Sequence, residues 1–476
     1  MSKRFLFCSA VGIAGITSMI NAYAADLPAR GVAPRIEYVR VCSVHGEGFF
    51  TIPGTDTCMR VSGYARADMR YVEPVNRIQD TVGYRARGRL NIDTRTATSF
   101  GNLRAYVRYE FERSTGSFNS LFSDEDDDTL GVPIAGGIED EADLDVAYIQ
   151  FGGLTAGIVQ SFFDFYTNDL SFEDLRGSDQ KPALLGYTAT FGEGLSATLS
   201  FEDALARRVT GAPFGGFPFP LTPGPNDAPG TGPLVFAGQR IPDIVGSVSA
   251  EQSWGDAKIS AAVHQIRTVN FAPGIVSPDG NVTDGTFADT KYGFAAQAGV
   301  RFDLPALAED DEIWFQASYA MGAVDYLNMG EFTQVGGALV TGVDGYVDPT
   351  GKVKLSRGFA VLSAFLHHWT PQIRQAVFGG YARLSYPGSG QARVIDPILG
   401  LINTGFVDFD EWRIGTNLIW SPVSGLDLGV ELFYTRLNPD GRVASAPIFG
   451  ASDEFRQRSI DSADVWIGRL RVNREF

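Results

Sequence analysis

The sequence predicts an all-β chain that closes into a sixteen-stranded antiparallel transmembrane β-barrel. Three observations predict this fold: sixteen segments of alternating apolar and polar residues, connections that alternate between short and long, and an amphipathic last segment that ends in Phe476. Alternation with period two is typical of strands whose two faces meet different surroundings. The barrel is expected to have short periplasmic turns and long extracellular loops.

The composition excludes several classes of protein. Of the 476 residues, 12% are aromatic and 20% charged, and the mean hydropathy is -0.03. This is too apolar for a disordered chain and too polar for a helical membrane protein. The net charge of -17 argues against a nucleic-acid partner. Three cysteines, four histidines and the lack of nucleotide or hydrolase motifs predict no metal, no cofactor and no enzymatic activity.

The first 24 residues are predicted to be a signal peptide that is removed on export. Lys3 and Arg4 precede an apolar stretch, and Ala22-Tyr23-Ala24 forms a small-x-small cleavage site. An uncleaved signal anchor is the alternative. Removal takes away two positive charges and gives a mature charge of -17 - 2 = -19. The expected domains are the signal peptide at 1–24, an N-terminal periplasmic segment at 25–57 and the barrel at 58–476.

After the signal peptide and the N-terminal segment, predicted strands follow one another along the rest of the chain. On the first, Arg60, Arg66 and Arg70 share one face, while small and aliphatic residues form the other. The predicted strands span 58–71, 84–96, 101–114, 142–151, 154–161, 183–191, 195–202, 243–254, 256–267, 289–303, 312–323, 357–369, 373–386, 407–421, 426–438 and 461–476.

The connections between these strands alternate in length. Gly152-Gly153 and Gly192-Glu193-Gly194 are among the short ones, and 115–141, 203–242 and 324–356 are among the long ones. A water-soluble sandwich has no reason to place every long loop at one end, whereas an outer-membrane barrel does. The pattern therefore predicts a multi-pass β-barrel in the outer membrane of a Gram-negative bacterium, and a soluble β-rich secreted protein is the alternative.

Energy decides which face of each strand meets lipid. Arginines occupy alternate positions on the first three strands, and one arginine facing lipid at the bilayer midplane costs roughly 2–4 kcal/mol. The arginine faces are therefore expected to line a polar interior. Sixteen strands enclose an aqueous lumen rather than a filled core. On the last strand, Trp466, Leu470 and Phe476 share the lipid side, and this end is expected to be recognised by the barrel-insertion machinery.

Five segments resemble alphaproteobacterial general porins: EYVRVC at 37–42, GEGFFTIPGTDTCMRV at 46–61, GYAR at 63–66, AYIQFGGLTAG at 147–157 and QSFFD at 160–164. The resemblance extends weakly to the end of the chain. It implies a sixteen-stranded, homotrimeric barrel for passive diffusion of ions and small hydrophilic solutes, in contact with outer-membrane lipid and lipopolysaccharide. The loops at 203–242 and 324–356 look longer than the family pattern.

The resemblance also implies that the third long loop, 162–182, folds inward and narrows the pore. Arginines at mid-height of the first three strands should face it across the lumen and give a transverse field. Because acids and bases nearly balance there, the acidic residues of the outer loops, such as Asp124 to Asp128, are expected to give the pore weak cation selectivity. A solvated acidic loop over the mouth is the alternative. The expected acidic side of the constriction is Asp164, Asp169, Glu173, Asp174 and Asp179, and the basic side is Arg66, Arg87, Arg89 and Arg108.

Cys42 and Cys58 are the two cysteines left after signal removal. Because export leads to an oxidising compartment, they are expected to form a disulfide, and two free thiols are the alternative. The run Asp124 to Asp128 is interpreted as a solvated charge run, with a divalent-cation site that bridges lipopolysaccharide as the alternative. A substrate-specific channel and, less strongly, an outer-membrane barrel enzyme are the competing functions.

Overall fold

The computed structural model describes most of the chain after the predicted signal peptide. The described residues are 40–74, 79–119, 137–209, 232–234, 236–269, 271–272, 286–336, 338–348, 351–388, 393–396, 400–403, 406–444, 448–449, 455–456 and 459–476. The predicted signal peptide at 1–24, the start of the N-terminal segment and the acidic run at Asp124 to Asp128 lie outside these ranges.

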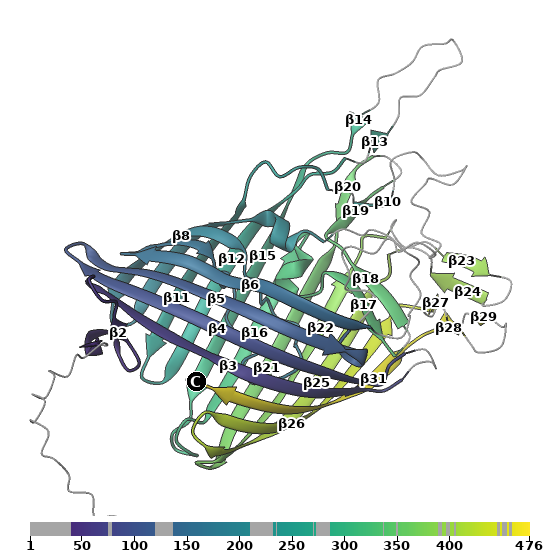
Figure 1. Cartoon of the computed structure of the whole chain (residues 1–476). Helices are drawn as coiled ribbons and strands as arrows, with labels where there is room; N and C mark the ends of the chain where they lie inside the picture. Colours follow the sequence, from purple (N-terminus) through teal and green to yellow (C-terminus); the bar gives the residue numbers. More distant parts are fainter. Residues whose placement is uncertain are drawn as a thin grey trace, which may run out of the picture.

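Sixteen long strands form one closed antiparallel sheet, as the sequence predicted (Figure 1). Each strand pairs with its neighbours along the chain. The strands are β3 (Thr57–Val72), β4 (Val82–Thr98), β5 (Gly101–Thr115), β6 (Ile138–Phe151), β7 (Leu154–Ile158), β8 (Ala183–Gly192), β9 (Leu195–Glu202), β11 (Asp243–Gln252), β12 (Gly255–Ile266), β15 (Lys291–Asp303), β16 (Glu312–Met321), β21 (Arg357–Thr370), β22 (Ile373–Ser385), β25 (Phe409–Val423), β26 (Leu426–Pro439) and β31 (Ala463–Glu475).

The first and last barrel strands close the sheet. β3 pairs with β31 from Tyr64 opposite Glu475 to Val72 opposite Ile467. The backbones of Gly63 and Phe476 exchange two hydrogen bonds, of 2.9 and 3.0 Å, so that the final residue joins the ladder. Closure removes the free edges that an open sheet would leave unpaired.

Most strand boundaries lie within two residues of the prediction, and two differ by more. β6 begins at Ile138 rather than residue 142, because Thr115 to Glu110 of β5 continue to pair with it towards the long-loop end. β7 ends at Ile158 rather than residue 161. Beyond that point the chain leaves the wall, and Ser161 donates its backbone N–H to Gln180 at 2.9 Å. This contact forms the neck of the third long loop, which we call loop 3 (159–182).

Side chains on successive positions point to opposite faces of the barrel. Trp412, Leu470 and Trp466 are about half exposed on the outer face, where the described apolar belt is continuous around the sheet. Polar side chains such as Asp68, Gln297 and Asn417 lie on the inner face, where loop 3 and neighbouring side chains cover them. Within the described ranges, no helix has the length and apolar character needed to cross a membrane.

Short elements at the long-loop end cover part of the barrel mouth. Several of them contribute to a buried cluster that includes Tyr326, Leu327 and Met329. These elements are the 3₁₀ turns η2 (Gly116–Phe118), η3 (Ala204–Arg207) and η4 (Val324–Leu327) and the strands β10 (Gly232–Pro233), β13 (Phe271–Ala272), β14 (Thr286–Phe287), β17 (Glu331–Val335), β18 (Ala338–Gly342), β19 (Gly345–Val347), β20 (Val353–Leu355), β23 (Arg393–Asp396), β24 (Gly400–Asn403), β27 (Val443–Ala444), β28 (Ile448–Phe449), β29 (Phe455–Arg456) and β30 (Ser459–Ile460).

The N-terminal segment folds back against the short-turn end of the barrel. Its hairpin consists of β1 (Arg40–Val41), the 3₁₀ turn η1 (Ser43–His45) and β2 (Phe50–Thr51), and β2 pairs with the start of β3. A disulfide joins Cys42 to Cys58, with Cα atoms 6.0 Å apart. The bridge ties the hairpin to the first barrel strand, which also brings the Phe49 ring under the guanidinium of Arg60.

We expect replacement of both cysteines, Cys42→Ser with Cys58→Ser, to lower the free energy of unfolding by about 3 kcal/mol, because the bridge closes a short loop in the unfolded chain. Denaturant unfolding in detergent micelles, compared with unreduced wild type, measures the difference. Mass spectrometry after alkylation is the control for the bridge itself. Two thiols that alkylate in unreduced, denatured protein would contradict the expectation.

Candidate functional site

The inner face of β3, β4 and β5 is an arginine wall. Cross-strand register aligns the arginines, because each lies at alternate positions of strands that pair without interruption over most of their length. The wall consists of Arg60, Arg66, Arg70, Arg85, Arg87, Arg89, Arg95, Arg104 and Arg108.

Carboxylates on the same wall neutralise most of these arginines. Arg87 lies 3.3 Å from Glu110, and Arg89 pairs with the same carboxylate. Arg108 lies 3.2 Å from Asp145 on β6. These ion pairs run along the barrel wall and not across the lumen, so they hold the guanidinium groups flat against the sheet.

Arg66 differs from its neighbours on the wall. Among the described residues it forms no ion pair within 4.0 Å. Its Nε donates to the side-chain oxygen of Asn473 at 3.1 Å, and its guanidinium lies 4.3 Å from the centre of the Tyr64 ring. Arg66 therefore keeps a positive charge that faces the lumen.

Loop 3 lies inside the barrel and packs on the wall opposite β3 to β5. Phe163, Tyr166 and Leu175 are fully buried between the loop and the inner faces of β15, β16, β21 and β25. Glycines on that wall make room for aromatic rings: a Cβ atom at Gly299 would collide with Phe165, and one at Gly429 would collide with the Phe172 ring. Any residue larger than glycine at these two positions would occupy the space that the rings fill.

Hydrogen bonds from distant strands fix the loop. The backbone N–H of Tyr166 donates to Gln316 on β16 at 2.9 Å. Glu431 on β26 accepts from the backbone N–H groups of Phe172 and Glu173, at 2.6 and 2.8 Å. Because a buried carboxylate that accepts two backbone N–H groups satisfies both of them, the loop tip has a defined position.

Two buried ion pairs hold the sides of loop 3. Arg176 lies 2.7 Å from Glu411 on β25, and both side chains are almost fully buried. Asp164 lies 3.3 Å from Arg207 of η3 and is likewise buried. Breaking a buried pair by removing one partner is strongly destabilising, since it leaves an uncompensated charge.

A family comparison gives the class of the molecule. Residues 29–468 match the model of the Porin subfamily. The chain belongs to this family. Porin Omp2b of Brucella suis is 30% identical over 283 residues, which cover 57% of this chain and 68% of that protein. Porin Omp2a of Brucella ovis is 33% identical over 198 residues, or 40% of this chain and 57% of that protein. The resemblance to alphaproteobacterial porins is thereby confirmed.

A solved structure has the same barrel fold. The outer membrane channel DcaP of Acinetobacter baumannii aligns with a TM-score of 0.54 at 15% identity, over 88% of this chain and 97% of that one. Family and fold together make this protein an outer-membrane general porin, a multi-pass β-barrel that forms a channel. The short-turn end of the porin is accordingly its periplasmic end, and the long-loop end is extracellular.

The acidic residues predicted for the constriction of this porin have unequal surroundings. Asp164 is buried in its pair with Arg207, so it anchors the loop and does not face the pore. Glu173 lies 3.0 Å from Arg70 and 2.8 Å from Arg469. Asp179 accepts from Gln160 at 3.0 Å within the neck.

Asp169 and Asp174 are the two loop 3 carboxylates that are exposed to the lumen. Neither forms an ion pair within 4.0 Å in the described part of the chain. Asp169 accepts a hydrogen bond from Thr167 at 3.2 Å. It also lines a cavity of about 220 Å³ to which Arg66 of β3 contributes. The structure thus brings Asp169 and Arg66 together, whereas Arg87, Arg89 and Arg108 turn towards their own wall.

Several charged residues around loop 3 were not among the predicted site residues. Arg469 and Arg471 lie on the inner face of β31, and Arg70 lies near the end of β3. The alternation on these strands already placed their side chains on the lumenal face. They were left out of the predicted constriction because that prediction took only arginines at mid-height of the first three strands. No sequence signal indicated Arg207, because it comes from a 3₁₀ turn in a long loop.

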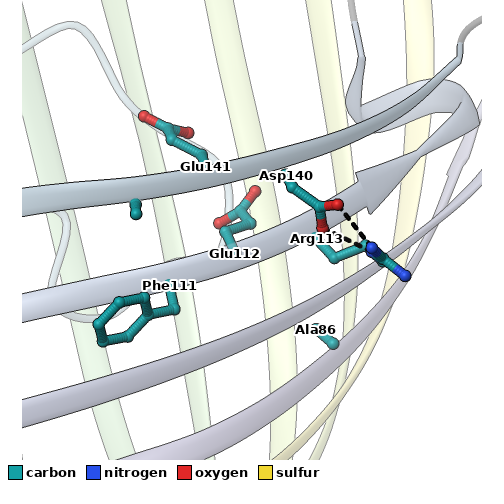
Figure 2. Close-up of a pocket in the computed structure, with 7 residues that line it drawn as sticks. Ala86, Phe111, Glu112, Arg113, Asp140 and Glu141 are labelled. Atoms are coloured by element: carbon teal, nitrogen blue, oxygen red, sulfur yellow. Dashed lines mark hydrogen bonds and ion pairs between the residues drawn. The ribbon is translucent and has the colours of Figure 1, made fainter.

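A second hollow lies at the extracellular end of β5 and β6, away from loop 3. It measures about 470 Å³ and is lined by residues that include Phe111, Glu112 and Glu141. Arg113 donates two hydrogen bonds of 2.5 Å to the carboxylate of Asp140 on the neighbouring strand (Figure 2). Both side chains of this pair are well exposed, and exposed ion pairs contribute little to stability.

We expect Glu431→Gln to loosen the tip of loop 3, because the amide nitrogen of glutamine cannot accept from the N–H groups of Phe172 and Glu173. Leaving one buried donor unsatisfied costs roughly 1–3 kcal/mol. Single-channel recording should show larger current fluctuations than wild type at the same voltage. Glu251→Gln, on β11 and exposed, is the matched control. Equal current fluctuations in wild type and Glu431→Gln would contradict the role of Glu431 in holding the loop tip.

Proposed function

We propose that this porin is a general diffusion channel with its narrowest point between loop 3 and the arginine wall, and that this point is weakly selective for cations. One observation carries the proposal: Asp169 and Asp174 face the lumen with no ion-pair partner among the residues that the structure describes, while most wall arginines are engaged by carboxylates. Of the predicted basic residues, Arg66 alone is left to oppose them.

Charge neutralisation around loop 3 supports the sign of this selectivity. Glu173 and its partners Arg70 and Arg469 carry a net single positive charge, which lies beside Asp174. Arg66 and Asp169 offset each other across one cavity. The acidic extracellular mouth of the pore then decides which ions are favoured, because the whole mature chain is expected to carry a charge of -19. Screening over a Debye length of about 8 Å at physiological salt keeps this preference small.

The same arrangement favours small hydrophilic solutes over apolar ones. Opposite charges on two walls of a narrow lumen produce a field across it, which orients water and dipolar solutes. An apolar solute would have to displace this oriented water without replacing its interactions. Passive diffusion down a gradient needs no further chemistry from the protein.

A substrate-specific channel is the second candidate, and stacked rings on the inner wall favour it. The rings of Tyr106 and Tyr148 stack with centroids 5.4 Å apart. However, the guanidinium of Arg104 lies over both rings, at 5.2 and 5.5 Å. Rings that are covered in this way offer little surface to a solute, so general diffusion is the better supported function. The barrel-enzyme alternative gains nothing from His264, which contacts carboxylates alone among the described polar groups.

The remaining assignments follow from the family resemblance and the export signals. We propose cleavage of residues 1–24, a periplasmic position for residues 25–57, and a homotrimer in contact with outer-membrane lipid and lipopolysaccharide. Phe476 is about two-thirds exposed at the periplasmic end, where the barrel-insertion machinery can reach it. No nucleic-acid partner is proposed, because the protein is acidic.

We expect wild-type channels in a planar bilayer to give reversal potentials of weak cation preference in a KCl gradient, and this preference should shrink as salt rises. The double variant Asp169→Asn with Asp174→Asn should shift the reversal potential towards anions, since it removes the two lumen-facing charges. Asp310→Asn, in an exposed periplasmic turn, is the control. A chloride-preferring wild type, or a double variant with unchanged reversal potential, would refute the proposed constriction.

A further inference from the structure

The neck of loop 3 is clamped from outside the loop by one side chain. Arg207 ends the 3₁₀ turn η3 and is 2% exposed. One of its terminal nitrogens donates to the Ser178 hydroxyl at 2.9 Å, and the other lies 3.3 Å from Asp164. Ser178 and Asp164 belong to the two opposite limbs of loop 3, so a single guanidinium holds both.

Asp164 connects Arg207 to further residues of the loop and of the barrel wall. Its second oxygen accepts from the backbone N–H of Gln180 at 2.9 Å and from the side chain of Gln160. Its backbone oxygen accepts from Lys258 on β12 at 2.7 Å. A change in the position of Arg207 therefore reaches the neck residues on both sides.

A buried chain of contacts leads from Arg207 to the barrel wall. The guanidinium lies 3.9 Å from the centre of the Tyr326 ring in η4. Tyr326 donates its hydroxyl to Asp243, the first residue of β11, at 2.8 Å. Both oxygens of Asp243 lie 2.9 Å from Nδ1 of His264 on β12. All four side chains are at most 2% exposed.

A second carboxylate faces the other side of the same imidazole. Oδ2 of Asp344, in the loop before β19, lies 3.8 Å from Nε2 of His264, and neither atom has a hydrogen-bond partner within the described ranges. Asp344 also accepts from the backbone N–H of Val324 at 2.8 Å, which connects it to η4. Arg208 is the remaining charged group near the imidazole; it lies over the Phe236 ring, whose edge meets His264.

We propose that Arg207 is the residue that positions loop 3 in the pore, and that the relay Tyr326–Asp243–His264–Asp344 makes this position depend on pH. The inference rests on loop 3 being the constriction proposed above. Arg207 touches no solute in this role, because it acts through Asp164 and Ser178.

The pH dependence follows from the charges of the relay. A protonated His264 places one positive charge between two carboxylates and can donate from both ring nitrogens. A neutral His264 keeps one donor, and its bare nitrogen then faces Asp344 without attraction. Burial raises the pKa of Asp344, whereas a nearby imidazolium opposes this rise. Loss of the proton therefore loosens Asp344, η4 and the Tyr326 ring on which Arg207 rests.

The first test compares Arg207 with an arginine outside the relay. Arg207→Lys keeps the charge but cannot span both limbs of loop 3, whereas Arg436→Lys alters an exposed side chain of β26 that donates to Asn438 at 3.1 Å. In liposome-swelling assays with sugars of increasing size, Arg207→Lys should admit large sugars faster than wild type, by roughly twofold or more. Arg436→Lys should match wild type. Equal rates in Arg207→Lys and wild type would overturn the positioning role.

The second test measures conductance between about pH 5 and pH 8, where histidine changes charge. Wild-type conductance should rise, with more fluctuation, towards high pH. His264→Asn, which cannot be protonated there, should show the high-pH behaviour throughout. His368→Asn, at the periplasmic end beside Asp311, should keep the wild-type profile. A wild-type profile in His264→Asn would overturn the relay.

A third variant covers the case in which His264→Asn fails to fold. Tyr326→Phe keeps the ring beneath Arg207 but removes the hydroxyl bound to Asp243, so it should flatten the pH profile as well. An unchanged profile would overturn the relay by itself. These results are separable from the proposed function, because reversal potentials of Asp169→Asn with Asp174→Asn test the constriction without involving Arg207 or His264.

Discussion

A backbone that crosses a membrane finds no water in the hydrocarbon, so each of its N–H and C=O groups needs a partner within the protein. This porin meets that constraint by pairing β31 with both β26 and β3, down to the exchange of hydrogen bonds between Gly63 and Phe476. Closure also fixes the two faces of every strand, because side chains alternate along a strand. The lumen and its contents depend on this closed ladder.

The closed wall places many charges side by side, and most of them neutralise one another within the sheet. Arg87 with Glu110 and Arg108 with Asp145 are examples. Paired charges of this kind line the lumen without dominating its potential. In the part of the chain that the structure describes, Arg66 and Asp169 have no ion-pair partner within 4.0 Å, and both line the same cavity.

Loop 3 takes its position from buried polar contacts rather than from its own conformation. Arg176 with Glu411 and Asp164 with Arg207 are buried pairs, and Glu431 accepts two backbone N–H groups from the loop tip. Desolvation offsets much of the attraction in such pairs, so they specify a geometry more than they stabilise the fold. Under the proposals above, groups that lie outside the constriction, Arg207 and His264 among them, adjust its position.

Local periodicity determined the strands, their number and the arginine face, because alternation is set by residues two positions apart. It also determined the alternation of turns and loops, and hence the class of barrel. Which lumenal charge meets which partner was decided by the tertiary structure. Arg176 and Glu411 are 235 residues apart, and Phe172 and Glu431 are 259; no local pattern couples such positions. Asp164 looked like its neighbours in the sequence, yet burial against Arg207 makes it an anchor while Asp169 stays in the water of the pore. The physical reason is that pairing and desolvation depend on where folding brings a charge, and that place is fixed only when the barrel closes around the loop.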